Sequence, residues 1–132
     1  MADSQVRTQR PLSPHIQIFR PYLTMMMSIT HRITGGALYV GTLLLVVWLL
    51  AAATGRSGYE HVQWFMGSII GRLILLGYTW ALIHHLIGGV RHLVWDVGLG
   101  FGPEARENMA RLNIIGSVVL TILIWIVAYA VR

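Results

Sequence analysis

The residues best suited to chemistry lie where a long apolar stretch of the chain ends. Two adjacent histidines, His84 and His85, are followed about one and a half turns later by a cationic pair, Arg91 and His92. An ionisable side chain inside a membrane is costly and is therefore taken first as a functional site. A buried haem needs an imidazole for its iron and cations near water for its propionates. This segment supplies both.

The positions around the two histidines distinguish one from the other. Residues three, four, seven and eight positions apart share a helical face. The face of His85 is almost free of bulk: Gly77, Tyr78, Ala81, Gly88, Gly89 and His92. His84 points about 100° away, onto a face with Trp80, Ile87, Gly88 and Arg91. We therefore predict that His85 binds the iron. Glycines alone favour simple helix packing, as in residues 67–71 (GSIIG), and only their combination with the histidine and the cationic pair favours haem.

A second iron ligand has to come from elsewhere. An electron-transfer haem takes two axial ligands, and adjacent histidines on one helix cannot bind opposite faces of one iron. No other histidine is expected at the same depth, because His31 lies at a helix end and His15 and His61 lie in polar segments. We predict that this chain supplies one ligand and another subunit the second.

A further set of polar residues begins the first apolar stretch. Ser28, His31 and Arg32 are spaced three and four residues apart, so they share a helical face at the membrane interface. A hydroxyl and a guanidinium there can donate hydrogen bonds to the carbonyl oxygens of a quinone. Spacing alone slightly favours an ordinary helix start with an interfacial arginine, so a quinone site is one of two open interpretations.

Composition and hydropathy predict the elements that position these residues. Of the 132 residues, 55% are hydrophobic and only 11% are charged, against roughly 25% charged in soluble domains. Three uncharged runs, residues 33–55, 73–90 and 112–131, approach the ~20 residues of a membrane-spanning helix. We predict an all-α integral membrane protein: a polar arm (1–22), then a domain (23–132) with transmembrane helices at about 23–53, 62–94 and 112–131. A turn is expected at 54–58, and a short amphipathic segment before residue 112.

Charge placement indicates the orientation. The net charge is +5 and all ten cationic residues are arginine. They cluster at helix ends, so lipid headgroups, haem propionates or a partner subunit are the expected counter-charges, and nucleic acid is not an expected partner. Cytoplasmic flanks are rich in basic residues, which predicts a cytoplasmic N-terminus. That side then holds Arg7, Arg10, Arg20, Arg32, Arg91, Arg106 and Arg111, and the other holds Arg56, Arg72 and Arg132. The chain has no cysteine, so no covalently attached haem is expected.

Three segments together resemble a known family. Residues 10–15 read RPLSPH, residues 28–35 read SITHRITG, and residues 85–96 read HLIGGVRHLVWD. The set resembles the cytochrome b subunits of succinate dehydrogenase, respiratory complex II, over nearly the whole chain.

The resemblance implies a four-subunit enzyme in the bacterial inner (plasma) membrane. A flavoprotein subunit oxidises succinate and an iron–sulfur subunit carries the electrons, while this chain and a second small membrane subunit bind haem b and reduce ubiquinone. By position, His85 matches the family's axial ligand, and Ser28 and Arg32 match its quinone-site residues. His31, Arg32 and His92 match residues near the haem propionates, a group to which the cationic pair adds Arg91. The chain would not be catalytic by itself.

Other functions remain open at this point. A haem-free structural anchor of a peripheral dehydrogenase and the anchor of a quinol:fumarate reductase both fit three spans and a polar arm. A small ion or solute carrier is disfavoured, because no carboxylate lies within any apolar run and no internal repeat of the kind found in transporters is present.

Overall fold

The computed structural model describes residues 12–131, and the regular secondary structure in this part of the chain is all helical. A short 3-10 helix, η1 (His15–Gln17), precedes α1 (Leu23–Thr54), α2 (Arg56–Gly67), α3 (Ile69–Asp96) and α4 (Pro103–Ala130). The helices α1, α3 and α4 are long and apolar enough to cross a membrane. The predicted all-α class with three spans is therefore confirmed. Residues 1–11 of the predicted arm, with Arg7 and Arg10, and also Arg132 lie outside the described residues.

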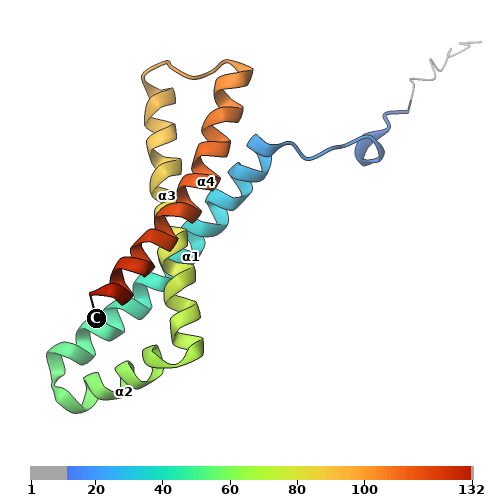
Figure 1. Ribbon diagram of the computed structural model, residues 1–132. Helices are drawn as coiled ribbons and strands as arrows, with labels where there is room; N and C mark the ends of the chain where they lie inside the picture. Colours follow the sequence, from blue (N-terminus) through green and yellow to red (C-terminus); the bar gives the residue numbers. More distant parts are fainter. Residues whose placement is uncertain (1–11, 132) are drawn as a thin grey trace, which may run out of the picture.

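The helices α1 and α3 each contact all three other α-helices, and the contacts of α3 are the more extensive. In Figure 1 the three long helices cross one another, α2 lies across one end of the bundle, and the arm before α1 projects from the other end. Most large apolar side chains are exposed on the outside. The interior holds mostly small and polar residues, together with Met27, Met66 and Ile83, as expected where helices pack closely in lipid.

The segment between α1 and α3 differs from the prediction. A turn at 54–58 followed by one helix from about residue 62 was expected. The turn is confined to Gly55, whose φ of 128° suits glycine, and α2 begins at once. The chain breaks again at Ser68, whose side chain accepts a hydrogen bond from the backbone N–H of Gly71 (3.1 Å) and so caps α3. Residues 67–71, interpreted from the sequence as a helix-packing pattern, thus form a helix boundary.

The helix α4 is also longer than predicted. The expected amphipathic segment and the last span form one helix that begins at Pro103. Proline suits the first helical position, where its missing N–H costs nothing, and Glu104 lies in the first turn, where a negative charge is favourable. Glu107 and Arg111 form an ion pair of 2.7 Å, one turn apart. Local charges therefore extend the helix beyond its apolar run.

The break at Ser68 yields a stability prediction. A Cβ added at Gly71 would meet the backbone of Phe65 and Met66, which cannot move aside as a flexible side chain can, whereas Gly67 has open space among the described residues. We expect Gly71→Ala to destabilise the protein by about 1–3 kcal/mol, and Gly67→Ala to be tolerated. Thermal denaturation of the detergent-solubilised protein measures both. Equal melting temperatures for the two variants would contradict this account of the break.

Candidate functional site

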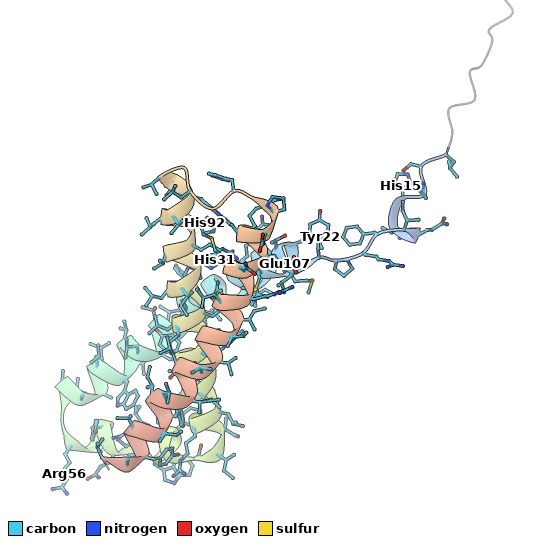
Figure 2. The ribbon with its side chains drawn as sticks, turned by 45° about the horizontal axis from the view of Figure 1, so that its top comes forward. His15, Tyr22, His31, Arg56, His92 and Glu107 are labelled. Atoms are coloured by element: carbon cyan, nitrogen blue, oxygen red, sulfur yellow. The ribbon has the colours of Figure 1, made fainter. Side chains whose placement is uncertain are left out.

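Histidines from two helices meet at the end of the bundle from which the arm projects. The rings of His31 (α1) and His85 (α3) are stacked, with centroids 3.9 Å apart and planes 7° from parallel. The ring of His92, two turns after His85, lies 5.5 Å from that of His31. Figure 2 shows His31 and His92 side by side at this end, with Arg56 at the opposite end. We name His31, His85 and His92 the histidine cluster.

The surroundings of His85 provide a hydrogen-bond partner for one of its ring nitrogens. The hydroxyl of Thr34 lies 3.4 Å from Nδ1 of His85. The same hydroxyl donates to a backbone carbonyl, that of Thr30 (2.9 Å) or His31 (3.0 Å). Because a hydroxyl has only one proton to donate, a Thr34 hydroxyl that donates to the carbonyl can accept from Nδ1–H of His85. The unprotonated nitrogen of His85 is then Nε2, the form in which histidine binds a metal.

A glycine on α1 allows the His85 ring to come this close. A Cβ at Gly35 would lie 3.1 Å from Cε1 of the imidazole, tighter than an ordinary van der Waals contact. The ring of His85 is half-buried. Nε2 of His84 is a buried atom without a hydrogen-bond partner, whereas Nε2 of His85 is not buried in this way. His85 is therefore held at one ring nitrogen and accessible at the other.

The neighbouring histidine has a different environment. His84 is 1% exposed, and its Nδ1 lies 3.3 Å from the Ser117 hydroxyl of α4. Its Nε2 is buried and has no hydrogen-bond partner among the described residues. A bulky ligand could reach Nε2 only by displacing the residues that bury it. His84 therefore connects these two helices.

The face around His85 is less open than the sequence suggested. Gly77 and Gly89 have open space among the described residues, as expected. Gly88 does not: a Cβ there would lie 2.5 Å from Nδ1 of His31 and 3.3 Å from Nδ2 of Asn113. The expectation of an empty face is therefore wrong for Gly88, which lets α1 and α4 approach α3 closely.

The cationic pair after His85 divides into an inner and an outer residue. Arg91 is only 6% exposed, and its guanidinium carbon lies 4.9 Å from the ring centroid of Trp95, within the range of a cation–π contact. His92 is exposed and meets the same indole edge-on, with ring centroids 5.1 Å apart. Trp95 thus contacts both Arg91 and His92.

The three polar residues at the start of α1 do not stay together. His31 turns inward to the cluster, while Ser28 and Arg32, one turn apart, are exposed on the outside of α1. Neither side chain has a hydrogen bond within the described part of the chain. Both are therefore free to bind something outside this chain, at the same end of the bundle as the cluster.

Sequence reasoning missed a polar row on α4. Asn113, Ser117 and Thr121 are buried, and Ser117 and Thr121 are linked because the Thr121 hydroxyl donates to the Ser117 carbonyl (2.7 Å). Their spacing of four residues inside an apolar run was the available signal, since such positions share one helical face. The row faces α3.

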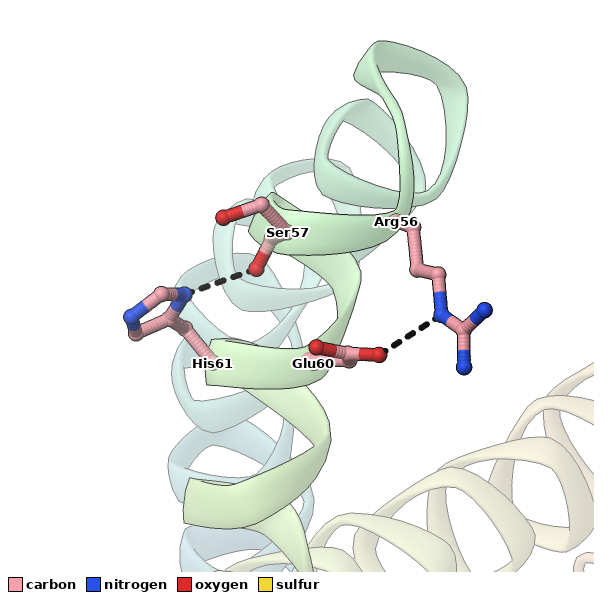
Figure 3. Close-up of polar contacts among 4 residues, drawn as sticks. All are labelled: Arg56, Ser57, Glu60 and His61. Carbon is pink, nitrogen blue, oxygen red and sulfur yellow. Dashed lines mark hydrogen bonds and ion pairs between the residues drawn. The ribbon is translucent and has the colours of Figure 1, made fainter.

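The opposite end of the bundle has separate features. A cavity of about 510 Å³ is lined there by residues that include Trp48, Arg72 and Trp125, and by no histidine. On α2, Arg56 pairs with Glu60 (2.8 Å), and the ring of His61 bonds the Ser57 carbonyl (2.7 Å), as Figure 3 shows. His61 is thus engaged locally and lies apart from the histidine cluster.

Comparisons with known proteins identify the family. The protein-family model described as succinate dehydrogenase/fumarate reductase transmembrane subunit matches residues 6–127 of this chain. The succinate dehydrogenase cytochrome b556 subunit of Paracoccus denitrificans is 43% identical over 129 residues, covering 98% of each chain. That of Rickettsia conorii is 33% identical over 122 residues, covering 92% of this chain and 95% of its own. The mitochondrial cytochrome b560 subunit of Sus scrofa is 36% identical over 107 residues, covering 76% of this chain and 62% of its own.

These matches cover the three spans and the histidine cluster, and they confirm the resemblance inferred from the sequence. The chain takes part in catalysis only as one subunit of a larger oxidoreductase. It belongs to the family of succinate dehydrogenase/fumarate reductase transmembrane subunits and is a multi-pass membrane anchor of complex II.

Proposed function

We propose that this chain binds haem b through His85, shares the haem with a second small membrane subunit, and helps to form the site where ubiquinone is reduced with electrons from succinate. When bound, the haem supplies a one-electron redox centre within the membrane. The observation that carries the proposal is the state of the His85 ring, held at Nδ1 by Thr34 and accessible at Nε2. A metal-binding histidine almost always donates its other ring N–H in this way.

The stacked rings support a second ligand from another subunit. His31 and His85 lie parallel at 3.9 Å, so they cannot approach one iron from opposite sides. His84 is buried against α4. Because a low-spin haem needs two axial ligands, we assign the second to the partner membrane subunit.

Four side chains are proposed to face the haem propionates. His31 and His92 belong to the cluster, and Arg32 is exposed one residue after His31. Arg91 lies deeper, over Trp95, so its contribution is a fixed positive charge in a region of low dielectric, where charges act more strongly than in water.

Ser28 and Arg32 are proposed to bind the quinone. A hydroxyl and a guanidinium one turn apart can donate to carbonyl oxygens, and such donors stabilise the negative charge that develops on those oxygens during reduction. Their exposure on the outer face of α1 leaves room for a ring that reaches them from the membrane or from beneath a partner subunit.

The orientation follows from charge. The cluster end of the bundle also holds the start of α1, the end of α3 and the start of α4. Five arginines of the described chain lie in or next to these segments: Arg20, Arg32, Arg91, Arg106 and Arg111. Basic flanks favour the cytoplasmic side, so we place this end at the cytoplasmic face of the bacterial inner membrane. The iron–sulfur subunit, which carries electrons from the flavoprotein, would dock there.

The ligand assignment is tested with the two adjacent histidines. We expect His85→Ala to abolish haem binding, because it removes the accessible Nε2. His84→Ala should keep a low-spin haem, because that ring serves only the contact with α4. The reduced-minus-oxidised spectrum of the purified complex measures both. Haem loss in His84→Ala alone would reverse the assignment, and a wild-type complex without haem would favour the structural-anchor alternative.

The role of Thr34 is tested with a matched pair. Thr34→Val keeps the shape of the side chain and removes the acceptor for Nδ1–H. Losing such a partner typically weakens metal binding by 10–100-fold, so we expect faster haem loss. Thr34→Ser retains the hydroxyl and should behave as wild type. The rate of haem transfer to an apoprotein acceptor measures this, and equal rates for the two variants would remove Thr34 from the mechanism.

The quinone site is tested by separating two activities. Ser28→Ala and Arg32→Leu should slow quinone reduction while preserving succinate oxidation by a soluble artificial acceptor. A hydrogen bond from a charged group contributes about 1.5–3 kcal/mol, roughly 10–100-fold, so Arg32→Leu should be the more severe. Arg56→Leu, at the other end of the bundle, is the control. If both activities fall together, assembly has failed and the assignment is not supported.

A further inference from the structure

The end of the bundle opposite the histidine cluster has a cavity to which all four α-helices contribute. Its volume is about 510 Å³, and it is open to the surroundings. Its lining includes Trp48 of α1, Gln63 of α2, Arg72 of α3 and Trp125 of α4. In Figure 1 this is the end where α2 lies across the bundle. We name it the four-helix cavity. Left empty, its walls would lose van der Waals contacts, so an occupant is expected.

The outer part of the four-helix cavity is polar. Arg72 lies three residues after Ile69, the first residue of α3, which is about 5 Å along the helix axis. Its guanidinium forms no ion pair and no hydrogen bond within the described part of the chain. Arg56, at the same end, is by contrast paired with Glu60 (2.8 Å). Arg72 therefore lacks the counter-charge that Arg56 has.

The inner part of the cavity is apolar. Thr79 in its wall lies seven residues after Arg72, about 10 Å further along α3, and Leu75 and Ile124 line the space as well. The indole N–H of Trp125 donates to the Thr79 hydroxyl (3.4 Å), which itself donates to the Leu75 carbonyl (2.7 Å). These polar groups are bonded to one another, so the inner part offers a ligand mainly apolar contacts.

We propose that the four-helix cavity binds one anionic phospholipid, with its phosphate on Arg72 and the upper part of an acyl chain beside Leu75 and Trp125. Arginine binds phosphate through two parallel N–H donors. Basic pockets between transmembrane helices bind anionic lipid headgroups. Trp48 and Tyr129, which also line the cavity, are of the residue types that lie at the depth of the headgroups.

Other occupants satisfy only one part of the cavity. A neutral quinone, or an apolar helix of a partner, fills the inner part but brings no counter-charge to Arg72. Free phosphate neutralises Arg72 but leaves the apolar part empty. An amphiphile with an anionic headgroup satisfies both parts. Because no histidine lines the cavity, this inference does not rest on the proposed haem or quinone sites.

The lipid also has a structural consequence. The helix α2 contacts α1 and α3, but it has no close backbone contact with α4 within the described residues. Since α2 and α4 both line the cavity, the bound lipid forms the layer between them. The complex should therefore be more stable to heat when the lipid is bound, because a ligand that binds only the folded state stabilises it.

The headgroup contact is tested by native mass spectrometry of the whole complex, delipidated in detergent and titrated with phosphatidylglycerol. We expect one tightly bound phosphatidylglycerol per copy of this chain. Arg72→Gln should weaken its binding roughly tenfold, because a hydrogen bond to a charged group is lost. Arg56→Gln, at the same end but outside the cavity lining, should bind as wild type. Equal affinities in Arg72→Gln and wild type would overturn the proposal.

The chemical class of the ligand is tested by thermal denaturation of the same delipidated complex. Phosphatidylglycerol should raise the melting temperature, and Arg72→Gln should reduce this gain. Inorganic phosphate, a diacylglycerol with the same chains and ubiquinone should each give a smaller gain that Arg72→Gln does not change. An equal gain from inorganic phosphate would indicate an anion site only. An equal gain from diacylglycerol or ubiquinone would indicate a site without headgroup recognition. Either result contradicts the proposal.

The apolar part is tested by filling it. Ala128 lines the cavity, so Ala128→Leu should displace the acyl chain and lower the affinity for phosphatidylglycerol. Ala130→Leu is the matched control, because Ala130 is two residues along α4 and outside the lining, about 200° around the helix. Unchanged affinity in Ala128→Leu would overturn the proposal even if Arg72→Gln did not assemble.

Discussion

The absence of water from the bilayer interior is the constraint on which this structure depends. Apolar side chains gain nothing by leaving lipid for one another, so they cannot hold the helices together as they would in a soluble protein. The large aliphatic residues accordingly remain outside. The contacts inside are made by residues that are small or can bond across helices, such as Thr34 with His85, Ser117 with His84, and Trp125 with Thr79.

The same constraint gives the two adjacent histidines opposite roles. Successive residues on a helix point about 100° apart, so on α3, which has α1 on one side and α4 on the other, neighbours are directed to different partners. His84 meets the polar row of α4 and becomes structural. His85 meets α1, where a hydroxyl orients it and a glycine makes room for it. One helix thus contributes His84 to the packing of the bundle and, on the proposed function, His85 to the haem site.

The sequence was sufficient for features that depend on one helix at a time. Three uncharged runs predicted the three spans, and the angle between His84 and His85 singled out the accessible ring. Features that depend on neighbours were not predictable in this way. Gly88 and Gly89 share the face of His85, yet Gly88 packs against α1 and α4 while Gly89 has open space. This difference depends on the positions of the other helices. The break at Ser68 depends on a single capping hydrogen bond within an otherwise helical pattern. Asn113 was overlooked because its run was interpreted by average hydropathy and not by its spacing of polar residues.

The geometry also explains why an anchor of this kind would depend on its partner. The apolar surface of α1 is almost wholly exposed, but lipid covers such a surface as well as a protein does, so exposure alone gives no reason to associate. What lipid cannot satisfy are the polar groups that this chain leaves incomplete: the free Nε2 of His85, the outward Ser28 and Arg32, and Arg91 and His92 beside Trp95. On the proposed function, a haem with its second ligand on another chain completes the first of these and links the two subunits directly. A haem site with one ligand missing would then give the assembly its specificity, because only a subunit that supplies the second axial ligand at the right depth can complete the site.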